Sequence, residues 1–156
     1  MDIIKHYGGN IMIKNHNIEF IYNNIASLRF PDGMRMDSEN KTENEDSFQL
    51  VSPDGLLRLC IEFFTSTKST REHMMELYTD VSCDFILPPA KIKTPTGIEG
   101  HYTTYKNGDE CYEETTLDLG GDARVNFWFL YNWSNPCNFD IYSQVKKDLL
   151  ENIRKV

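Results

Sequence analysis

The sequence predicts an α+β fold, in which an antiparallel β-sheet carries helices packed on its faces. Two observations support this prediction. Apolar residues alternate with a period of two in several short segments, as in half-buried strands, and recur every three to four residues in two others, as in amphipathic helices. The strand segments also follow one another across short turns, which indicates antiparallel pairing rather than parallel βαβ winding.

The segment Asp46–Phe64 is the clearest element, and the rest of the chain is organised around it. Its centre, Ser52-Pro53-Asp54-Gly55, suits a type I turn, because Pro53 pre-sets the first central φ and Gly55 accepts a positive φ. The segment therefore predicts a β-hairpin. One face of its second arm is aliphatic and aromatic, with Leu57, Leu59, Ile61 and Phe63.

The residues before this hairpin predict further strands. Ile11 and Ile13, then Ile18, Phe20 and Tyr22, alternate on either side of Asn15-His16-Asn17, which predicts an N-terminal hairpin. Ile25–Phe30 predicts another strand, ended by Pro31-Asp32-Gly33. Met36–Asp46 is strongly polar and without apolar periodicity, so we expect a solvated loop there.

Two segments predict helices. Ser69 and Glu72 match a capping box, and one helical stripe follows it, with Met74, Leu77, Tyr78 and Val81. A stripe at this spacing usually packs against a sheet, although methionine also occurs on binding faces. The segment Asp140–Arg154 predicts the second helix, with Ile141, Val145, Leu149 and Ile153 on one face.

The segments between the two helices again predict strands. Cys83–Leu87 predicts a short strand or an extended segment, and Lys91–Pro95 predicts a basic, extended connection. Ile98–Lys106 and Cys111–Leu119 predict a second hairpin around Asn107-Gly108, a strong turn dipeptide.

The register of this second hairpin depends on the length of its loop. A two-residue loop would place His101 opposite Glu114 and Thr104 opposite Cys111, and a four-residue loop would shift the pairing. Arg124–Trp133, which follows, carries bulky apolar residues on both faces and so predicts a central strand that is covered, at least in part, on both sides.

Length and charge limit the kinds of partner. The 156 residues suit a single domain, 1–156, that is large enough to bury its own core. The net charge of −8, from 24 acidic and 16 basic residues, disfavours nucleic acid and anionic membranes as partners. The chain begins without a signal-peptide pattern and contains no apolar run of about 18 residues. We therefore expect a cytoplasmic protein with reduced cysteines.

Catalytic, metal and cofactor motifs are absent from the sequence, so we expect no catalytic residues, no bound metal and no cofactor. CxxC, HExxH and phosphate-loop patterns do not occur, and Cys60, Cys83, Cys111 and Cys137 are widely spaced. The strongest catalytic candidates are His101 and Cys111 on the second hairpin. In the two-residue-loop register they point to opposite faces, which argues against a Cys–His dyad.

The order of these elements, with a few short phrases, resembles the Mog1/PsbP-like superfamily, which includes DcrB-like proteins and the Eag-type chaperones of type VI secretion effectors. The phrases are Phe30-Pro31-Asp32-Gly33, Gly97-Ile98-Glu99-Gly100, Phe127–Tyr131 and Leu149–Ile153. The resemblance covers roughly Ile18–Val156 and implies an α-β-α sandwich. Its members are mostly binding or adaptor proteins, and no set of functional residues transfers to this chain.

We therefore expect a non-enzymatic, acidic domain that binds a protein partner as an adaptor, including the possibility of a secretion-effector chaperone. The proposed binding residues are Tyr102, Tyr105 and Tyr112, because tyrosine combines apolar area with a polar tip. Two alternatives stay open. An acidic inhibitor or immunity protein predicts carboxylates gathered on one face. An enzyme with a Cys/His or carboxylate site predicts a deep pocket of titratable groups. The sequence leaves the oligomeric state open.

Overall fold

The computed structural model describes residues 2–6, 9–14, 17–37 and 46–156. They form two antiparallel sheets and two helices. The smaller sheet has five strands in the order β1 (Asp2–His6), β2 (Gly9–Lys14), β3 (Asn17–Tyr22), β4 (Ala26–Arg29) and β13 (Ile153–Lys155). The larger has eight, and seven run in the order β5 (Arg35–Met36), β6 (Ser47–Val51), β7 (Arg58–Thr65), β12 (Ala123–Asn132), β11 (Glu110–Gly120), β10 (Glu99–Asn107) and β8 (Phe85–Ile86). The eighth, β9 (Ala90–Lys93), also pairs with β10.

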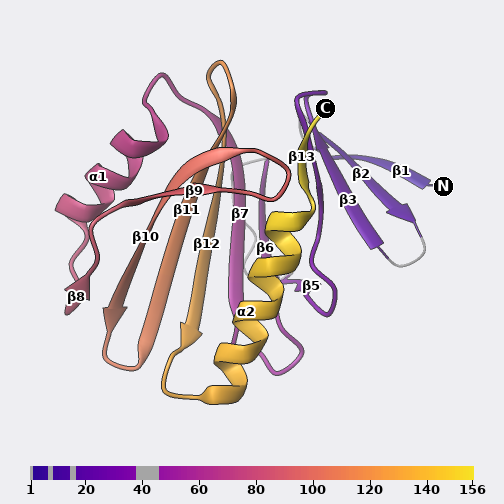
Figure 1. The fold of residues 1–156 in the computed structure, drawn as a ribbon. Coiled ribbons are helices and arrows are strands. Elements are labelled where there is room, and N and C mark those ends of the chain that lie inside the picture. Colours follow the sequence, from indigo (N-terminus) through magenta and orange to yellow (C-terminus); the bar gives the residue numbers. More distant parts are fainter. Residues whose placement is uncertain (1, 7–8, 15–16, 38–45) are drawn as a thin grey trace.

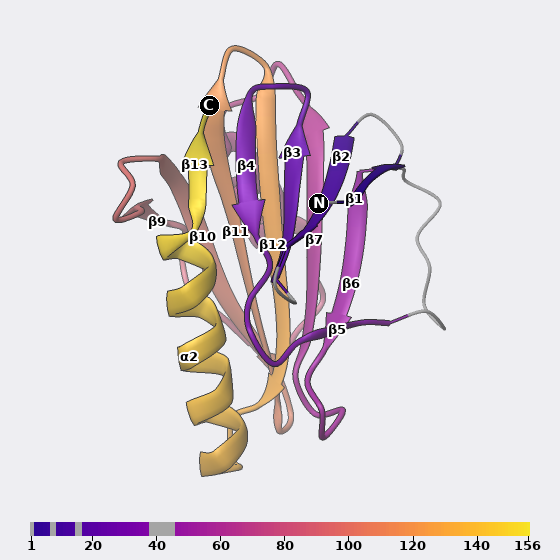
Figure 2. The ribbon, with the colours of Figure 1, turned by 90° about the vertical axis from the view of Figure 1, so that its right-hand side faces the viewer.

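The elements stack in three layers. Helix α1 (Thr70–Asp80) lies on one side of the larger sheet, while α2 (Pro136–Glu151) and the smaller sheet lie on the other side (Figure 1). Figure 2 shows α2 leading directly into β13, so that the helix and the smaller sheet form one continuous layer. The predicted α+β class, an antiparallel sheet with helices on its faces, is confirmed.

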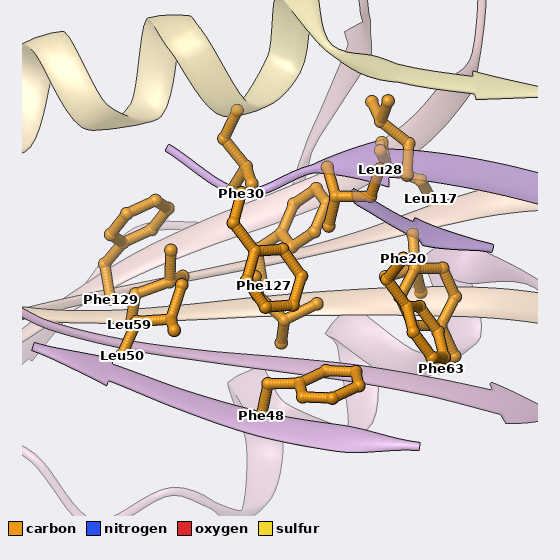
Figure 3. Packing of buried hydrophobic residues seen from close by; sticks show 14 of the residues in the cluster. Phe20, Leu28, Phe30, Phe48, Leu50, Leu59, Phe63, Leu117, Phe127 and Phe129 are labelled. Atoms are coloured by element: carbon orange, nitrogen blue, oxygen red, sulfur yellow. The ribbon is translucent and has the colours of Figure 1, made fainter. Parts of the chain in front are cut away.

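The core lies between the two sheets and is rich in phenylalanine (Figure 3). The ring centroids of Phe20 and Phe48 are 4.7 Å apart, and those of Phe20 and Phe63 are 5.1 Å apart. Phe127, on the central strand β12, is fully buried beside them. Strands of both sheets therefore contribute to one hydrophobic core, which stabilises the association of the two sheets.

The hairpin Asp46–Phe64 forms as predicted. Val51 pairs with Arg58 and Phe48 pairs with Ile61, which places the expected apolar face in the core. In the turn, the Gly55 amide donates to the Ser52 carbonyl at 2.9 Å, and Gly55 has φ of 76°.

The N-terminal hairpin is also confirmed by the pairing of β2 with β3. The sequence did not predict β1, which adds a further strand, or β13, which pairs with β4. The predicted loop Met36–Asp46 lies, for residues 38–45, outside the described residues.

Helix α1 begins at the predicted cap. The Ser69 side chain accepts from the Glu72 amide at 3.1 Å. Of the predicted stripe, Met74 is buried against the sheet, whereas Leu77 and Tyr78 are half-buried. The stripe therefore packs against the sheet through its N-terminal half.

The predicted bounds of the second helix, Asp140–Arg154, are wrong at both ends. The helix already begins at Pro136, because the Asn135 side chain caps it by accepting from the Cys137 amide at 3.1 Å, and proline suits the first helical position. It ends at Glu151, and Ile153 belongs to β13. Pro136 is thus the first residue of the helix.

The second hairpin has its turn one residue further along than predicted. Asn107 pairs with Glu110, so the loop is Gly108-Asp109, with φ of 58° at Gly108. Asn107 stays in the strand because its side chain accepts from the Asp84 amide at 3.0 Å. His101 consequently faces Thr116 rather than Glu114, the partner that a two-residue loop at Asn107-Gly108 would have given it.

The strands that pair with the outer side of this hairpin, along β10, are short. Phe85–Ile86 forms a strand within the predicted Cys83–Leu87 segment. The predicted connection Lys91–Pro95 is wrong in part, because Ala90–Lys93 pairs along β10. Neither of the two helices in the described residues combines the length and the apolar character that crossing a lipid bilayer requires.

Candidate protein-binding face

The two sides of the larger sheet differ in how far other elements of the chain cover their side chains. On the side of α2 and the smaller sheet, every second residue of β7 and β12 is buried. On the opposite side, α1 contacts β10 and β11, and the neighbouring strands keep half-exposed side chains. We call this second side of β6, β7 and β12 the open face. Its half-exposed residues are Ser47, Gln49, Arg58, Cys60, Glu62, Phe64, Asn126, Trp128, Leu130 and Asn132.

An aromatic group borders the open face next to α1. The rings of Tyr105 and Tyr112 are stacked, with centroids 4.9 Å apart and planes 4° from parallel. Trp128 lies against Tyr112 at 5.6 Å and donates its indole N–H to the Tyr105 hydroxyl at 3.2 Å. These contacts hold the rings in fixed positions, and preorganised aromatic side chains are what protein interfaces favour.

Both tyrosines of this group resist ionisation. Burial, followed by the charge of Glu114, raises the pKa of Tyr105 to about 12. The hydrogen bond that the Tyr112 hydroxyl donates to Glu110, followed by burial, raises the pKa of Tyr112 to about 12. The two hydroxyls are therefore neutral hydrogen-bonding groups at pH 7.

The three tyrosines proposed from the sequence do not share a face. Tyr102 lies on the side of α2, where the Lys146 ammonium is 5.3 Å from its ring centroid. Tyr105 lies on the opposite side of the sheet but is only 7% exposed, and Tyr112 beside it is half-exposed. The cause is the period of two, because residues three apart on a strand point to opposite faces.

Between α1 and the open face lies a small pocket of about 190 Å³. We call it the glutamate pocket. It is lined by Glu62, Phe64, His73, Met74, Leu77, Glu114, Thr116 and Asn126. Its walls thus combine apolar side chains from the helix with carboxylates from β7 and β11.

The Glu114 carboxylate is held by neutral groups. The Asn126 side-chain amide donates to it at 3.2 Å and the Tyr105 hydroxyl at 3.3 Å. Burial raises the pKa of Glu114, the two hydrogen bonds oppose this effect, and the nearby charge of Glu62 raises the pKa further. Across the strands, Glu114 pairs with Thr103 and Trp128 rather than with His101.

The proposed Cys–His pair is not assembled. Cys111 points to the side of α2, whereas His101 points to the side of α1 and hydrogen-bonds the Thr70 hydroxyl at 2.8 Å. Burial raises the pKa of the Cys60 and Cys111 thiols, so neither is a thiolate at pH 7. All four cysteines are free.

Among the described residues, no group of three or more metal-binding side chains comes together. Larger depressions, of about 640, 540 and 320 Å³, lie elsewhere on the described residues. The carboxylates are spread over several surfaces, since Glu113 and Glu114 point to opposite sides of the sheet and Asp148 lies on α2. Glu113 and Glu114 therefore do not share one face.

A second group of exposed apolar residues lies on the side of α2. Phe85, Leu87, Trp133 and Phe139 are each 45–54% exposed. The Lys106 ammonium lies 4.4 Å from the Trp133 ring centroid, and Lys106 pairs with Phe85 across the strands. This group is a competing candidate for a contact surface.

A buried charge fastens α2 to the sheet. Glu113, 5% exposed, accepts a hydrogen bond from the Tyr142 hydroxyl and forms an ion pair with Lys146. Burial, followed by the charge of Glu113, raises the pKa of Tyr142. This network joins β11 to α2 and has no access to the open face, so we assign it a structural role.

Comparison with known proteins relates the fold to solved structures. No family model matches the sequence, and no curated protein matches it. The crystal structure of the Ran-binding protein Mog1p from Saccharomyces cerevisiae is similar, with a TM-score of 0.57, 13% identity, and coverage of 88% of this chain and 94% of Mog1p. A structure of a Mog1 point mutant is also similar, with a TM-score of 0.53, 13% identity, and coverage of 88% and 95%. The likeness expected from the sequence is therefore confirmed at the level of fold, and the chain has a Mog1/PsbP-like fold.

Proposed function

We propose that this chain is a non-enzymatic protein-binding domain and that its partner docks on the open face. The observation that carries the proposal is the unequal burial of the larger sheet. One side is closed by α2 and the smaller sheet, while the other keeps Phe64, Trp128 and Leu130 half-exposed on rigid strands. Large aromatic and aliphatic side chains on a fixed surface are typical anchors of protein interfaces.

The fold supports a protein partner. Mog1p, which shares the fold, is described as Ran-binding, and Ran is therefore a defined first probe for this chain. The resemblance to secretion-effector chaperones gives a second partner class, a client protein held by an adaptor. Both classes require an exposed apolar surface, and the open face supplies one. Tyr112 borders this surface, and Tyr105 stacks on Tyr112 from the neighbouring strand.

The test compares two tryptophans that differ mainly in where they lie. Trp128→Ala removes the half-exposed ring of the open face, and Trp133→Ala removes a 45% exposed ring from the side of α2. Wild-type and variant proteins are used to capture partners from lysate of the native source, and binding to purified Ran is measured by calorimetry. Thermal melting checks that each variant is folded.

We expect Trp128→Ala to weaken binding of the captured partner by more than tenfold, since interface anchors contribute about 2 kcal/mol or more. Trp133→Ala should leave the affinity unchanged. The opposite result, loss of the partner with Trp133→Ala and retention with Trp128→Ala, would place the interface beside Lys106 and overturn the proposal.

A further inference from the structure

A second site lies beside the start of α1, in the depression of about 540 Å³. It is formed by the first residue of α1 and by β9, β10 and β11, and we call it the basic pocket. Its polar lining residues are Thr70, Lys91, Lys93, Glu99, His101 and Asp118. The basic pocket shares no residue with the open face, and its volume lies within the range of about 300–1,000 Å³ that is usual for small ligands.

The sheet register brings two lysines to the side of α1. Lys91 pairs with His101, and Lys93 pairs with Glu99, across β9 and β10. Residues that pair in this way project to the same face of a sheet. His101 lies on the side of α1, where it hydrogen-bonds the Thr70 hydroxyl at 2.8 Å. Both ammonium groups therefore lie on that side of the sheet.

The two carboxylates of the basic pocket are balanced by neighbouring cations. The Asp118 carboxylate accepts hydrogen bonds from the Arg124 guanidinium at 3.1 Å and from the Gly120 amide at 2.8 Å, so Arg124 neutralises its charge. Glu99 is exposed and lies opposite Lys93, whose charge offsets its own. The carboxylates therefore do not make this pocket acidic.

Two further cations are left in excess. Lys91 lines the pocket, and Arg71 is the second residue of α1. Within the part of the chain that the structure describes, neither of them forms an ion pair. Burial, followed by the charges of Lys91 and Arg71, lowers the pKa of His101. Both positive charges therefore act on the same part of the pocket, in a chain whose net charge is −8.

His101 can add a hydrogen-bond donor. Its Nδ1 atom is bonded to the Thr70 hydroxyl, and Nε2 has no partner among the described residues. An acceptor ligand favours the tautomer in which the hydroxyl donates to Nδ1 and Nε2 carries the proton. A neutral imidazole thereby donates to the ligand beside the two cations.

A phosphate monoester matches these features. It carries a charge of about −1.5 to −2 at pH 7 and has three acceptor oxygens, whereas a carboxylate would bring a single charge to the two excess cations. Lysine and arginine both bind phosphate groups in proteins. Ile92, half-buried in the same lining, offers an apolar contact to the organic part of the ester.

We propose that the basic pocket binds a phosphate monoester, with its phosphoryl oxygens between Lys91 and Arg71 and beside His101. The ester is either a free small molecule or a phosphorylated side chain, since both present the same group. This site goes beyond the proposed function, because it involves neither the open face nor the partner that docks there.

The test titrates small probes into the isotopically labelled chain at low ionic strength, where exposed charges are least screened. The probes are glycerol phosphate, for a free ester, and N-acetyl-phosphoserine amide, for a modified side chain. N-acetyl-aspartate amide and N-acetyl-serine amide are the controls with one charge and with none. We expect saturable NMR shifts at the amides of Thr70, Lys91 and His101 with both esters, at least fivefold weaker binding of the aspartate probe, and none of the serine probe. The tighter ester identifies the source of the ligand.

The histidine rings give a second measurement. A bound dianion favours the imidazolium, so saturating glycerol phosphate should raise the pKa of His101. His73 is the internal control, because burial also lowers its pKa but it lines the glutamate pocket instead. Its pKa should stay the same when the ester binds.

Charge-removing variants separate the basic pocket from general basicity. Lys91→Gln and Arg71→Gln should each weaken ester binding about fivefold, at the upper end for an exposed ion pair. Lys147→Gln, at an exposed position of α2, changes the net charge equally and should have no effect. Circular dichroism checks that each variant is folded.

Absence of ester binding, aspartate binding as tight as that of the esters, ester binding that both pocket variants retain, or an equal rise in pKa at both histidines would each overturn the inference. Because the basic pocket and the open face share no residue, failure of the ester probes leaves the proposed function standing. Failure of the open-face test likewise leaves this inference standing.

Discussion

Replacing Gly100 with alanine should strongly destabilise the protein. Gly100 lies on β10 opposite Leu117 of β11. A Cβ atom added at Gly100 would lie 2.1 Å from the Thr116 carbonyl oxygen and 2.9 Å from both the Cα and a Cδ atom of Leu117. The first two are backbone atoms, which cannot rotate away as a side chain can.

The magnitude follows from these distances. Real Cβ contacts essentially never fall below 3.0 Å, so the two strands would have to move apart by roughly 1 Å in a close-packed layer. Overpacking costs about 1–3 kcal/mol and occasionally more, while alanine in place of glycine within a strand normally gains about 0.5–1 kcal/mol. Because the clash involves backbone, we expect a net loss of about 3 kcal/mol in the free energy of unfolding. For a chain of this length, the midpoint of thermal unfolding should fall by about 6–12 °C.

The assay is thermal and urea unfolding followed by circular dichroism, with Gly97→Ala as the control. Gly97 lies three residues earlier with φ of 91° and has open space around its would-be Cβ. Its substitution strains only the backbone, at a cost of about 1–2 kcal/mol. Equal stability of Gly100→Ala and wild type, or a smaller loss than for Gly97→Ala, would refute the close approach of β10 and β11 at this position.

Three further predictions concern stability. Lys146→Met should lower the free energy of unfolding by about 3 kcal/mol, at the low end for a broken buried ion pair because Lys146 is 25% exposed. Adding Glu113→Gln should recover most of this loss in chemical unfolding, and a double variant without recovery would contradict the ion pair. Ser69→Ala should cost about 1 kcal/mol by removing the cap of α1, whereas Ser82→Ala, an exposed control, should melt like wild type. Glu114 has a raised pKa in the folded state, so its protonated form favours folding at acid pH, and this stabilisation is lost as the pH rises from 4.5, the ordinary pKa, through the raised pKa. Glu114→Gln should therefore remove this fall in melting temperature with rising pH, and the variant should be more stable than wild type at pH 7. An unchanged fall in the variant would show that another group causes it.

Strong local signals made several elements predictable from the sequence. The hairpin Asp46–Phe64 combines a Pro-Asp-Gly turn with alternation in its second arm, and its apolar face was predicted correctly because a one-residue slip would expose the aliphatic side chains. The start of α1 was correct because a capping box depends on residues three positions apart. The hairpin and the start of the helix both depend on residues that are close together in the sequence.

Elements that depend on distant residues were missed. The turn of the second hairpin is displaced because Asn107 binds the backbone at Asp84, which the dipeptide Asn-Gly cannot reveal. The strands β9 and β13 are short, and pairing with a longer partner defines them. The location of the open face also depends on distant residues, because apolar residues on both sides of β12 do not reveal that α1 contacts β10 and β11 instead.

The smaller sheet and α2 combine the first and the last segments of the chain, which affects folding during synthesis. Arg29, at the end of β4, binds Asp148 of α2 at 3.0 Å, although the two are 119 residues apart in the chain. During synthesis on the ribosome, β3 and β4 therefore emerge long before the helix and strand that complete their layer. Until then, Phe20 and Leu28 lack part of their final cover, and the unfinished sheet has an unpaired edge. This interval is when the nascent chain is most exposed to mispairing and to chaperones.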